Sequence, residues 1–161
     1  MENIEFKPKG SVIVGTTVSR GQRITAVAQL CPGDTFSEFI GQKIVKYRLE
    51  IKQRKRDLAN TREVISLLQS INERENIAVA LGERKPWDVS KHWMRFIQEA
   101  CEERNSQLEN IAFAKAMVEV LNKTNGNFQA MRDIINAKNW KDEKKEQLIK
   151  EVNALERASK E

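Results

Sequence analysis

A long amphipathic pattern between Phe36 and Glu75 constrains the fold of this chain more than any other feature. Apolar residues recur there at steps of four, three and seven, the spacing of a coiled-coil seam. The pattern predicts one helix of about 40 residues, about 60 Å long at 1.5 Å per residue. Because no isolated domain core supports a helix of that length, its partner must be another long helix. The stripe consists of Phe36, Ile40, Ile44, Tyr47, Ile51, Leu58, Ile65 and Leu68.

Two positions of this stripe are polar. Arg54 and Thr61 stand where the spacing calls for apolar residues. Such interruptions are usually solvated positions, but they can also mark a polar pocket between two helices.

A second stripe predicts the partner helix over roughly residues 89–122. Gly82 and Pro86 mark the connection, although residues 77–81 can extend the first helix. Two helices of similar length with a short connection should pair antiparallel as a helical hairpin. The apolar positions of the second helix are Trp93, Phe96 or Ile97, Ala100 or Cys101, Leu108, Ile111, Val118 and Leu121.

The two ends of the chain carry different patterns. Residues 1–9 are charged and contain proline, and we expect a flexible lead-in. Residues 11–18 and 23–30 are rich in β-branched residues and flank a Ser-Arg-Gly-Gln turn, which predicts a β-hairpin. Residues 128–138 and 142–157 predict two short helices around Trp140.

These elements define an expected fold class, α+β and mostly α. An N-terminal β-hairpin should pack on the antiparallel pair of long helices, because a lone hairpin is marginal in water. We expect three parts: the lead-in at residues 1–9, the hairpin and helix pair at 10–122, and a C-terminal helical hairpin at 127–158, which can form a subdomain of its own.

Composition and motifs exclude several classes of protein. No run of about 18 apolar residues is present, so no membrane span is expected, and the first ten residues lack the apolar region of a signal peptide. Cys31 and Cys101 lie far apart, and His92 is the single histidine, so neither a disulfide nor a zinc site is expected. No nucleotide-binding, hydrolase or metalloprotease motif appears. We therefore expect a non-enzymatic protein without a cofactor.

The positive charge of the chain is concentrated in one segment. The whole chain carries a net charge of +5. The segment from Lys43 to Arg56 holds seven basic residues against one acid, Glu50, and so accounts for all of this excess. Such a helix can be a solvated surface, a site for an anionic small ligand such as a nucleotide, or a contact for the nucleic-acid backbone. The basic residues are Lys43, Lys46, Arg48, Lys52, Arg54, Lys55 and Arg56.

Aromatic residues gather near the start of the second long helix. Trp87, Trp93 and Phe96 stand there with His92 and Arg95. Such a group usually closes the end of a helix pair. It can also provide a stacking platform for a nucleobase, with cationic side chains nearby for phosphates.

The segment that joins the predicted hairpin to the first long helix resembles a known pattern. Small phage-encoded proteins carry the run C-x-x-D-x-F-x-x-x-x-G between a hairpin and a helix, and this chain is most similar to the first family of Thoeris anti-defence proteins. The similarity in architecture covers about residues 12–122. The matching residues are Cys31, Pro32, Asp34, Phe36 and Gly41.

The resemblance implies a dimer, or a higher homo-oligomer, that sequesters a cyclic-nucleotide immune signal without cleaving it. The signal would be a cyclic ADP-ribose isomer or a cyclic oligonucleotide, bound in the cytoplasm of the host cell. Under this hypothesis, Arg20 or Arg23 of the hairpin and Arg48 or Lys52 of the first helix would meet phosphates, because arginine favours bidentate contacts.

The second helix would supply the remaining contacts of this hypothesis. Trp93 or Phe96 would stack on a base, and Arg95 or Arg104 would meet phosphates. Asn105 would read a base edge or a ribose hydroxyl. The alternative hypotheses are a dimeric helical nucleic-acid-binding or regulatory protein that uses the basic face of the first helix, and an inhibitor that docks on a host protein.

Overall fold

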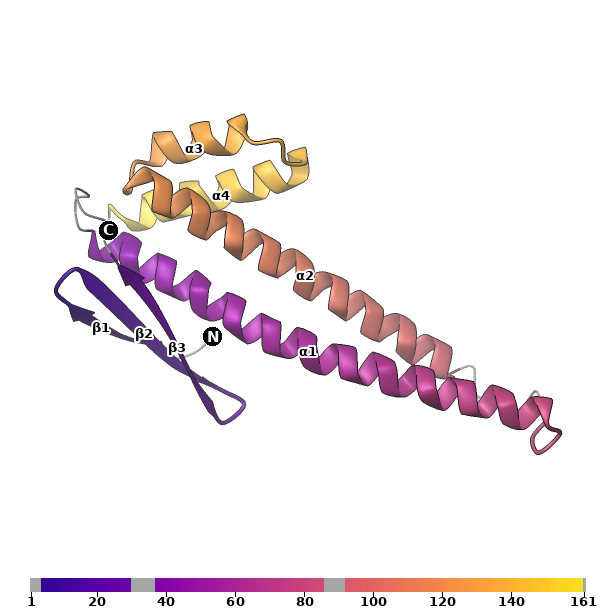
Figure 1. Ribbon diagram of the computed structural model, residues 1–161. Coiled ribbons are helices and arrows are strands. Elements are labelled where there is room, and N and C mark those ends of the chain that lie inside the picture. The colour runs from indigo at the N-terminus through magenta and orange to yellow at the C-terminus, as the bar shows by residue number, and fades with distance from the viewer. Residues whose placement is uncertain (1–3, 30–36, 86–91, 161) are drawn as a thin grey trace. The chain divides into compact units, whose positions relative to one another are not determined.

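The computed structural model describes residues 4–29, 37–85 and 92–160. Its elements are β1 (Glu5–Lys9), β2 (Val12–Ser19), β3 (Gln22–Gln29), α1 (Glu38–Ala80), α2 (His92–Thr124), α3 (Phe128–Ala137) and α4 (Asp142–Ala158). Figure 1 labels each of these elements along the chain. The predicted fold class, α+β and mostly α, is confirmed. The matched run from Cys31 to Phe36 lies outside the described residues, as does Trp87.

The chain divides into two compact units. Unit 1 comprises Met1–Gln53 and Ile111–Glu161, and unit 2 comprises Arg54–Asn110. Unit 1 therefore contains the sheet, the first part of α1, the last part of α2, and both short helices. Unit 2 contains the rest of the two long helices and their connection.

The sheet of unit 1 is antiparallel, with strand order β1-β2-β3. Residues Ser19 and Gln22 close the predicted hairpin, and the two turn residues, Arg20 and Gly21, both have positive φ angles of 51° and 74°. Positive φ at both central residues defines a type I′ turn, whose twist matches that of the flanking strands. The hairpin prediction is thus confirmed.

The expected flexible lead-in at residues 1–9 is wrong for residues 5–9, which form strand β1. This strand pairs along its whole length with β2, from Glu5 opposite Thr16 to Lys9 opposite Val12. Pro8 lies in the edge strand β1, opposite Ile13 of β2, in a non-hydrogen-bonded pair. Its nitrogen therefore faces away from β2, where no N–H is needed. Proline therefore did not exclude a strand here, because an edge strand tolerates it.

Two glycines allow the sheet to approach α1 closely. A Cβ atom on Gly15 of β2 would collide with Val45, and one on Gly41 of α1 would lie 2.5 Å from Cδ1 of Ile13. Ile13 is 1% exposed and Val45 is fully buried. Gly41, which belongs to the matched sequence run, thus has a packing role against the sheet.

The C-terminal helices share the core of unit 1. Buried side chains from the sheet, α1, α2, α3 and α4 form one continuous cluster, which includes Met131, Ile135, Leu148 and Val152. Tyr47 of α1 is buried and donates a hydrogen bond of 2.5 Å to Oε1 of Glu151 on α4. Residues 127–158 form the expected helical hairpin but not a separate subdomain, because their apolar faces are completed by the rest of unit 1.

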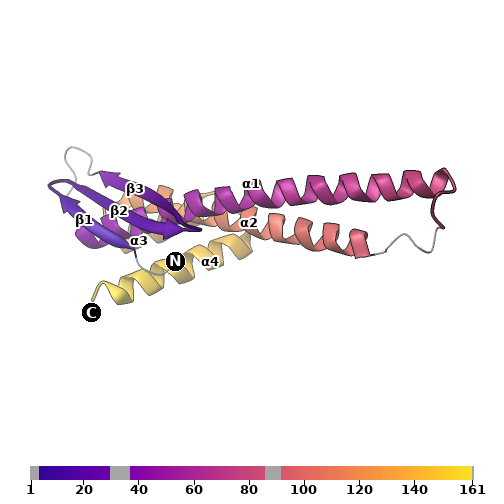
Figure 2. The same cartoon turned by 90° about the horizontal axis from the view of Figure 1, so that it is seen from below.

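Unit 2 contains two antiparallel helical segments, from α1 and α2 (Figure 2). A polar contact joins them. Nε2 of Gln107, a buried residue, donates hydrogen bonds to Oγ1 of Thr61 at 3.2 Å and to Oε1 of Glu103 at 2.8 Å. The interrupted stripe at Thr61 therefore marks a polar layer between helices. Leu108, expected on the buried stripe, is 41% exposed, and the neighbouring Gln107 occupies the interior instead.

Candidate functional site

Two of the basic residues expected to meet phosphates, Arg48 and Lys52, lie beside the sheet. Because Ser19 and Gln22 form the hydrogen-bonded pair next to the turn, hydrogen-bonded and non-hydrogen-bonded pairs alternate from there. Thr25 and Val27 stand in non-hydrogen-bonded pairs with β2, so their backbone groups point toward the free edge of β3. This register leaves a row of carbonyl groups along that edge.

Arg48 and Lys52 bond to these carbonyl groups. Nη1 of Arg48 donates to the carbonyl oxygen of Val27, and Nζ of Lys52 donates to that of Thr25 at 2.6 Å. The two cations are one helical turn apart on α1, and their acceptors are two residues apart on β3. They occupy an edge that would otherwise be open to pairing with another strand. A phosphate at this place would have to compete with the backbone carbonyl groups.

The two hairpin arginines are at and near the turn. Arg20 is a turn residue, Arg23 follows at the start of β3, and both are exposed. Arg23 shares the outer face of β3 with Thr25 and Val27, since alternate residues of a strand point to the same side. The structure thus places Arg20, Arg23, Arg48 and Lys52 in unit 1.

The remaining predicted residues all belong to unit 2. The rings of Trp93 and Phe96 make an edge-to-face contact at 6.2 Å between centroids. Nε of Arg95 pairs with Oε1 of Glu99 at 2.8 Å, one turn along α2. Nη2 of Arg104 donates to Oδ1 of Asn105 at 3.3 Å. These residues and the four of unit 1 therefore form two separate groups.

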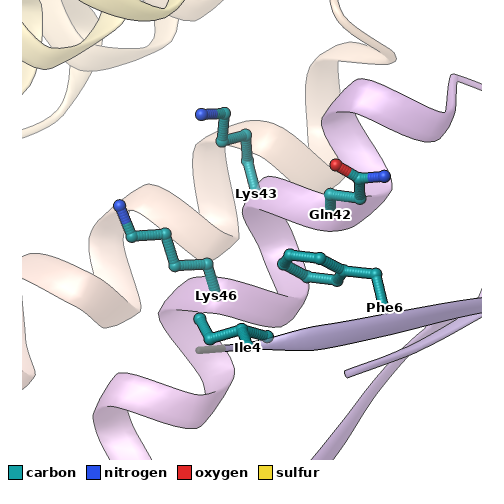
Figure 3. A pocket seen from close by; sticks show the side chains of 5 residues that line it. All are labelled: Ile4, Phe6, Gln42, Lys43 and Lys46. Atoms are coloured by element: carbon teal, nitrogen blue, oxygen red, sulfur yellow. The ribbon is translucent and has the colours of Figure 1, made fainter. Parts of the chain in front are cut away.

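A pocket of about 270 Å³ lies between β1 and α1 in unit 1. Figure 3 shows its lining: Ile4 and Phe6 from the N-terminal strand region, and Gln42, Lys43 and Lys46 from α1. The phenyl ring of Phe6 stands beside the helix, and the side chains of Lys43 and Lys46 extend from the helix with their ammonium groups directed away from this ring. The sheet holds Phe6 there because its neighbours in β1, Glu5 and Lys7, point to the other face.

The polar groups of this pocket are suited to an anion. Lys43 places its ammonium 4.9 Å from the centroid of the Phe39 ring, which restrains that side chain. Nε2 of Gln42 donates to Oε1 of Glu38 at 3.0 Å, and its own oxygen can accept a hydrogen bond from a ligand. The pocket thus combines an aromatic wall, two cations and an amide, and these groups can hold a ring that bears a negative group.

The structure divides the basic segment of α1 between two sides of the helix. Lys43 and Lys46 lie on the side of β1, at the pocket. Arg48 and Lys52 lie on the side of β3, at the sheet edge. The segment does not form one continuous basic face within unit 1. Ile4 and Phe6 were not among the predicted site residues, although their alternation with Glu5, Lys7 and Lys9 is a strand signal.

Comparison of the chain with protein-family models, with curated proteins and with solved structures finds no match. In the described part of the chain, no three His, Cys, Asp or Glu side chains stand close enough together to hold a metal ion. None of the described helices has the length and the apolar character needed to cross a bilayer.

Proposed function

We propose that this protein binds a small anionic ligand with an aromatic ring, without catalysis, and that the pocket between β1 and α1 holds part of that ligand. A cyclic nucleotide, such as a cyclic ADP-ribose isomer or a cyclic oligonucleotide, is the class of ligand that we propose. The observation that carries the proposal is the shared lining of the pocket, where Lys43 and Lys46 of α1 stand next to Phe6 of β1.

The chemistry of a nucleotide matches this lining. The two ammonium groups attract a phosphate, and charge-assisted hydrogen bonds to phosphate are among the stronger ones in proteins. The face of Phe6 accepts a base by stacking with little selectivity. Gln42 offers the oxygen of its amide to a base edge or a ribose hydroxyl. These groups need only to bind the ligand. A protein that sequesters a signal requires affinity for the intact ligand and no stabilisation of a transition state.

The size of the pocket limits what it encloses. Pockets for small molecules usually measure about 300–1,000 Å³, so about 270 Å³ suits one ring and one phosphate rather than a whole cyclic dinucleotide. The remainder of such a ligand would extend beyond the pocket. We propose that the protein acts as a homo-oligomer in the cytoplasm of a phage-infected cell, where it lowers the concentration of an immune signal.

Calorimetry and thermal unfolding of the full chain test this function. The ligands are cyclic ADP-ribose isomers, cyclic dinucleotides, AMP and inorganic phosphate, with a duplex DNA at about 50 and 200 mM salt as the polymer control. A ligand at a hundred times its Kd adds about 2.7 kcal/mol to stability, so we expect a rise in Tm of several degrees with a cyclic nucleotide. Mass spectrometry should recover that ligand intact after the protein is heated.

A pair of lysine variants locates the binding site. Lys46→Gln should weaken cyclic-nucleotide binding about tenfold or more, because it removes one of two cations from the pocket. Lys150→Gln removes an exposed cation from α4, on the same unit but away from the pocket, and should leave binding unchanged. The proposal fails if no ligand changes Tm and no heat is measured. Equal weakening by both substitutions would rule out this pocket as the site, and binding to DNA alone would favour the nucleic-acid hypothesis.

A further inference from the structure

Unit 2 has few buried apolar side chains and several large exposed ones. Among its described residues, Leu58 and Ile65 are the buried apolar side chains. Seven large apolar side chains of the same unit are more than 40% exposed: Val64, Leu67, Ile77, Leu81, Met94, Phe96 and Leu108. A helix pair with so small a core gains little from its own packing, because most helical stability in proteins comes from burial of an apolar face.

The exposed Val64 and Leu67 of α1 belong to a stripe of regular spacing. In this half of α1, the side that faces α2 includes Leu58, Thr61 and Ile65, at steps of three and four residues. A second stripe repeats the same steps on another side of the helix. It consists of Asp57, Asn60, Val64, Leu67, Ile71, Arg74 and Ala78, and Leu81 continues the spacing directly after the helix ends.

This second stripe has the form of a coiled-coil seam with its apolar centre exposed. Val64 is 49% exposed and Leu67 is 62% exposed, and Ile71 is partly exposed. Alternating steps of three and four residues keep one stripe of a helix against one partner helix over several turns. A helix with two such stripes fits a bundle in which it has two helical neighbours. Within unit 2, α2 is the neighbour of the first stripe.

The order of charges along the stripe indicates which helix occupies it. Asp57 lies seven residues before Val64, and Arg74 lies seven residues after Leu67. If an identical helix lies antiparallel across the stripe, Val64 faces the partner's Leu67 and Asp57 faces the partner's Arg74. The two-fold axis then repeats both contacts. A parallel arrangement would place like charges opposite each other, which costs stability.

We propose that α1 pairs antiparallel with α1 of a second copy, through the stripe from Asp57 to Arg74, around a two-fold axis between Val64 and Leu67. The interface is isologous, so each copy provides the same surface. It buries the apolar centre in the middle and places one ion pair at each end. The pairing rests on unit 2 alone and does not depend on ligand binding by unit 1.

The mass of the full chain in solution, measured by light scattering after size exclusion, tests the interface. We expect twice the mass of one chain at concentrations of tens of micromolar. Leu67→Glu should give a monomer, because it places two carboxylates in the apolar centre. Ser66→Glu, an exposed position on a different side of α1, is the matched control and should remain a dimer. Circular dichroism of each variant verifies that the helices persist.

A charge exchange tests the antiparallel register. Asp57→Arg and Arg74→Asp should each weaken the dimer about tenfold, and the double variant should restore most of the affinity. Asp57 also takes part in an interaction within its own chain, so restoration by the second substitution is the informative result. Weakening by both single changes without restoration would overturn the proposed register.

Disulfide trapping gives an independent measurement. In a background in which Cys31 and Cys101 are serine, a mixture of Val64→Cys and Leu67→Cys chains should form crosslinked heterodimers. Val64→Cys chains alone should crosslink far less, since an antiparallel pairing places Val64 opposite the partner's Leu67. A monomeric wild-type protein, a Leu67→Glu dimer, or preferential crosslinking between identical positions would each contradict the proposal.

Discussion

Val45 of α1 fills the space above Gly15 of β2 in which any other residue would carry its Cβ atom. Gly15 stands in the middle of a strand, where glycine is normally unfavourable. The contact explains its presence, because the backbone of β2 must come close to the helix for Ile13 and Val45 to be buried together. The sheet is thereby held against the same helix that carries Lys43 and Lys46 of the proposed pocket.

Gly15→Ala should destabilise the protein. The added methyl group collides with Val45 and comes within 3.4 Å of Leu49, and overpacking of this kind costs about 1–3 kcal/mol. Urea unfolding measures the change in free energy. Gly21→Ala is a useful comparison, because no atom lies within 4 Å of a Cβ there and its cost arises from the positive φ of 74° alone. A Gly15→Ala protein as stable as the wild type would show that the sheet does not pack this closely.

Replacement of both Arg48 and Lys52 by methionine should expose the edge of β3. The hydrogen bonds to Val27 and Thr25 are lost, and because both are exposed we expect a loss of only about 1–2 kcal/mol. Open strand edges promote pairing between molecules, so light scattering should show aggregation that rises with concentration. Lys46→Met, on the β1 side of the same helix, is the control and should stay dispersed.

Tyr47→Phe should lower the stability of the protein, because it removes the hydrogen bond between α1 and α4 while it preserves the volume of the core. It leaves the half-buried Glu151 without the donor that it has in the wild type, and the net contribution of such a hydrogen bond to stability is about 0.5–1.5 kcal/mol. Chemical denaturation at pH 7 measures this loss. If Glu151→Gln, which retains an acceptor for the hydroxyl group, were as damaging as Tyr47→Phe, the hydrogen bond would not be its cause.

The same tyrosine should make the protein sensitive to alkali. Burial and, secondarily, the hydrogen bond to Glu151 raise the pKa of Tyr47 well above its usual value of 10. The unfolded chain therefore releases this proton at a lower pH than the folded chain does, and stability falls as pH rises above about 10. Unfolding midpoints at pH 8 and pH 11 should differ less for Tyr47→Phe than for the wild type, and an equal difference would contradict this origin.

Glu119 should contribute to the loss of stability in acid. Hydrogen bonds from Lys123, at 2.8 Å, and from Lys138, at 2.7 Å, lower its pKa from 4.5 to about 2. The contribution is present above pH 4.5 and is lost as pH falls toward 2, because the unfolded chain takes up the proton first. Since about a third of this side chain is exposed, solvent screening reduces the effect to below about 1 kcal/mol. Glu119→Gln should show a smaller decrease in urea midpoint between pH 6 and pH 2.5.

One wall of the proposed pocket could be predicted from the sequence, and the other could not. The basic segment of α1 was evident, and Lys43 and Lys46 belong to it. The other wall of the pocket contains Ile4 and Phe6, in a region that was expected to be flexible because it is short, charged and contains proline. A strand of five residues is too short for its alternation to outweigh those signals, and its stability comes from pairing with β2.

The amino-acid sequence by itself determined the long helices, the hairpin and the two short C-terminal helices, because each depends on spacing that repeats along the chain. Tertiary structure alone decided which side of a helix each charge occupies and which elements share a core. Arg48 and Lys52 belong to the same basic segment as Lys43 and Lys46, yet they bond to carbonyl groups of β3. The physical reason is that the free edge of β3 offers carbonyl acceptors to the cations of α1 that lie beside it. Which cations lie there depends on the strand register and on the packing of the sheet against α1, and both are set by contacts between residues far apart in the chain.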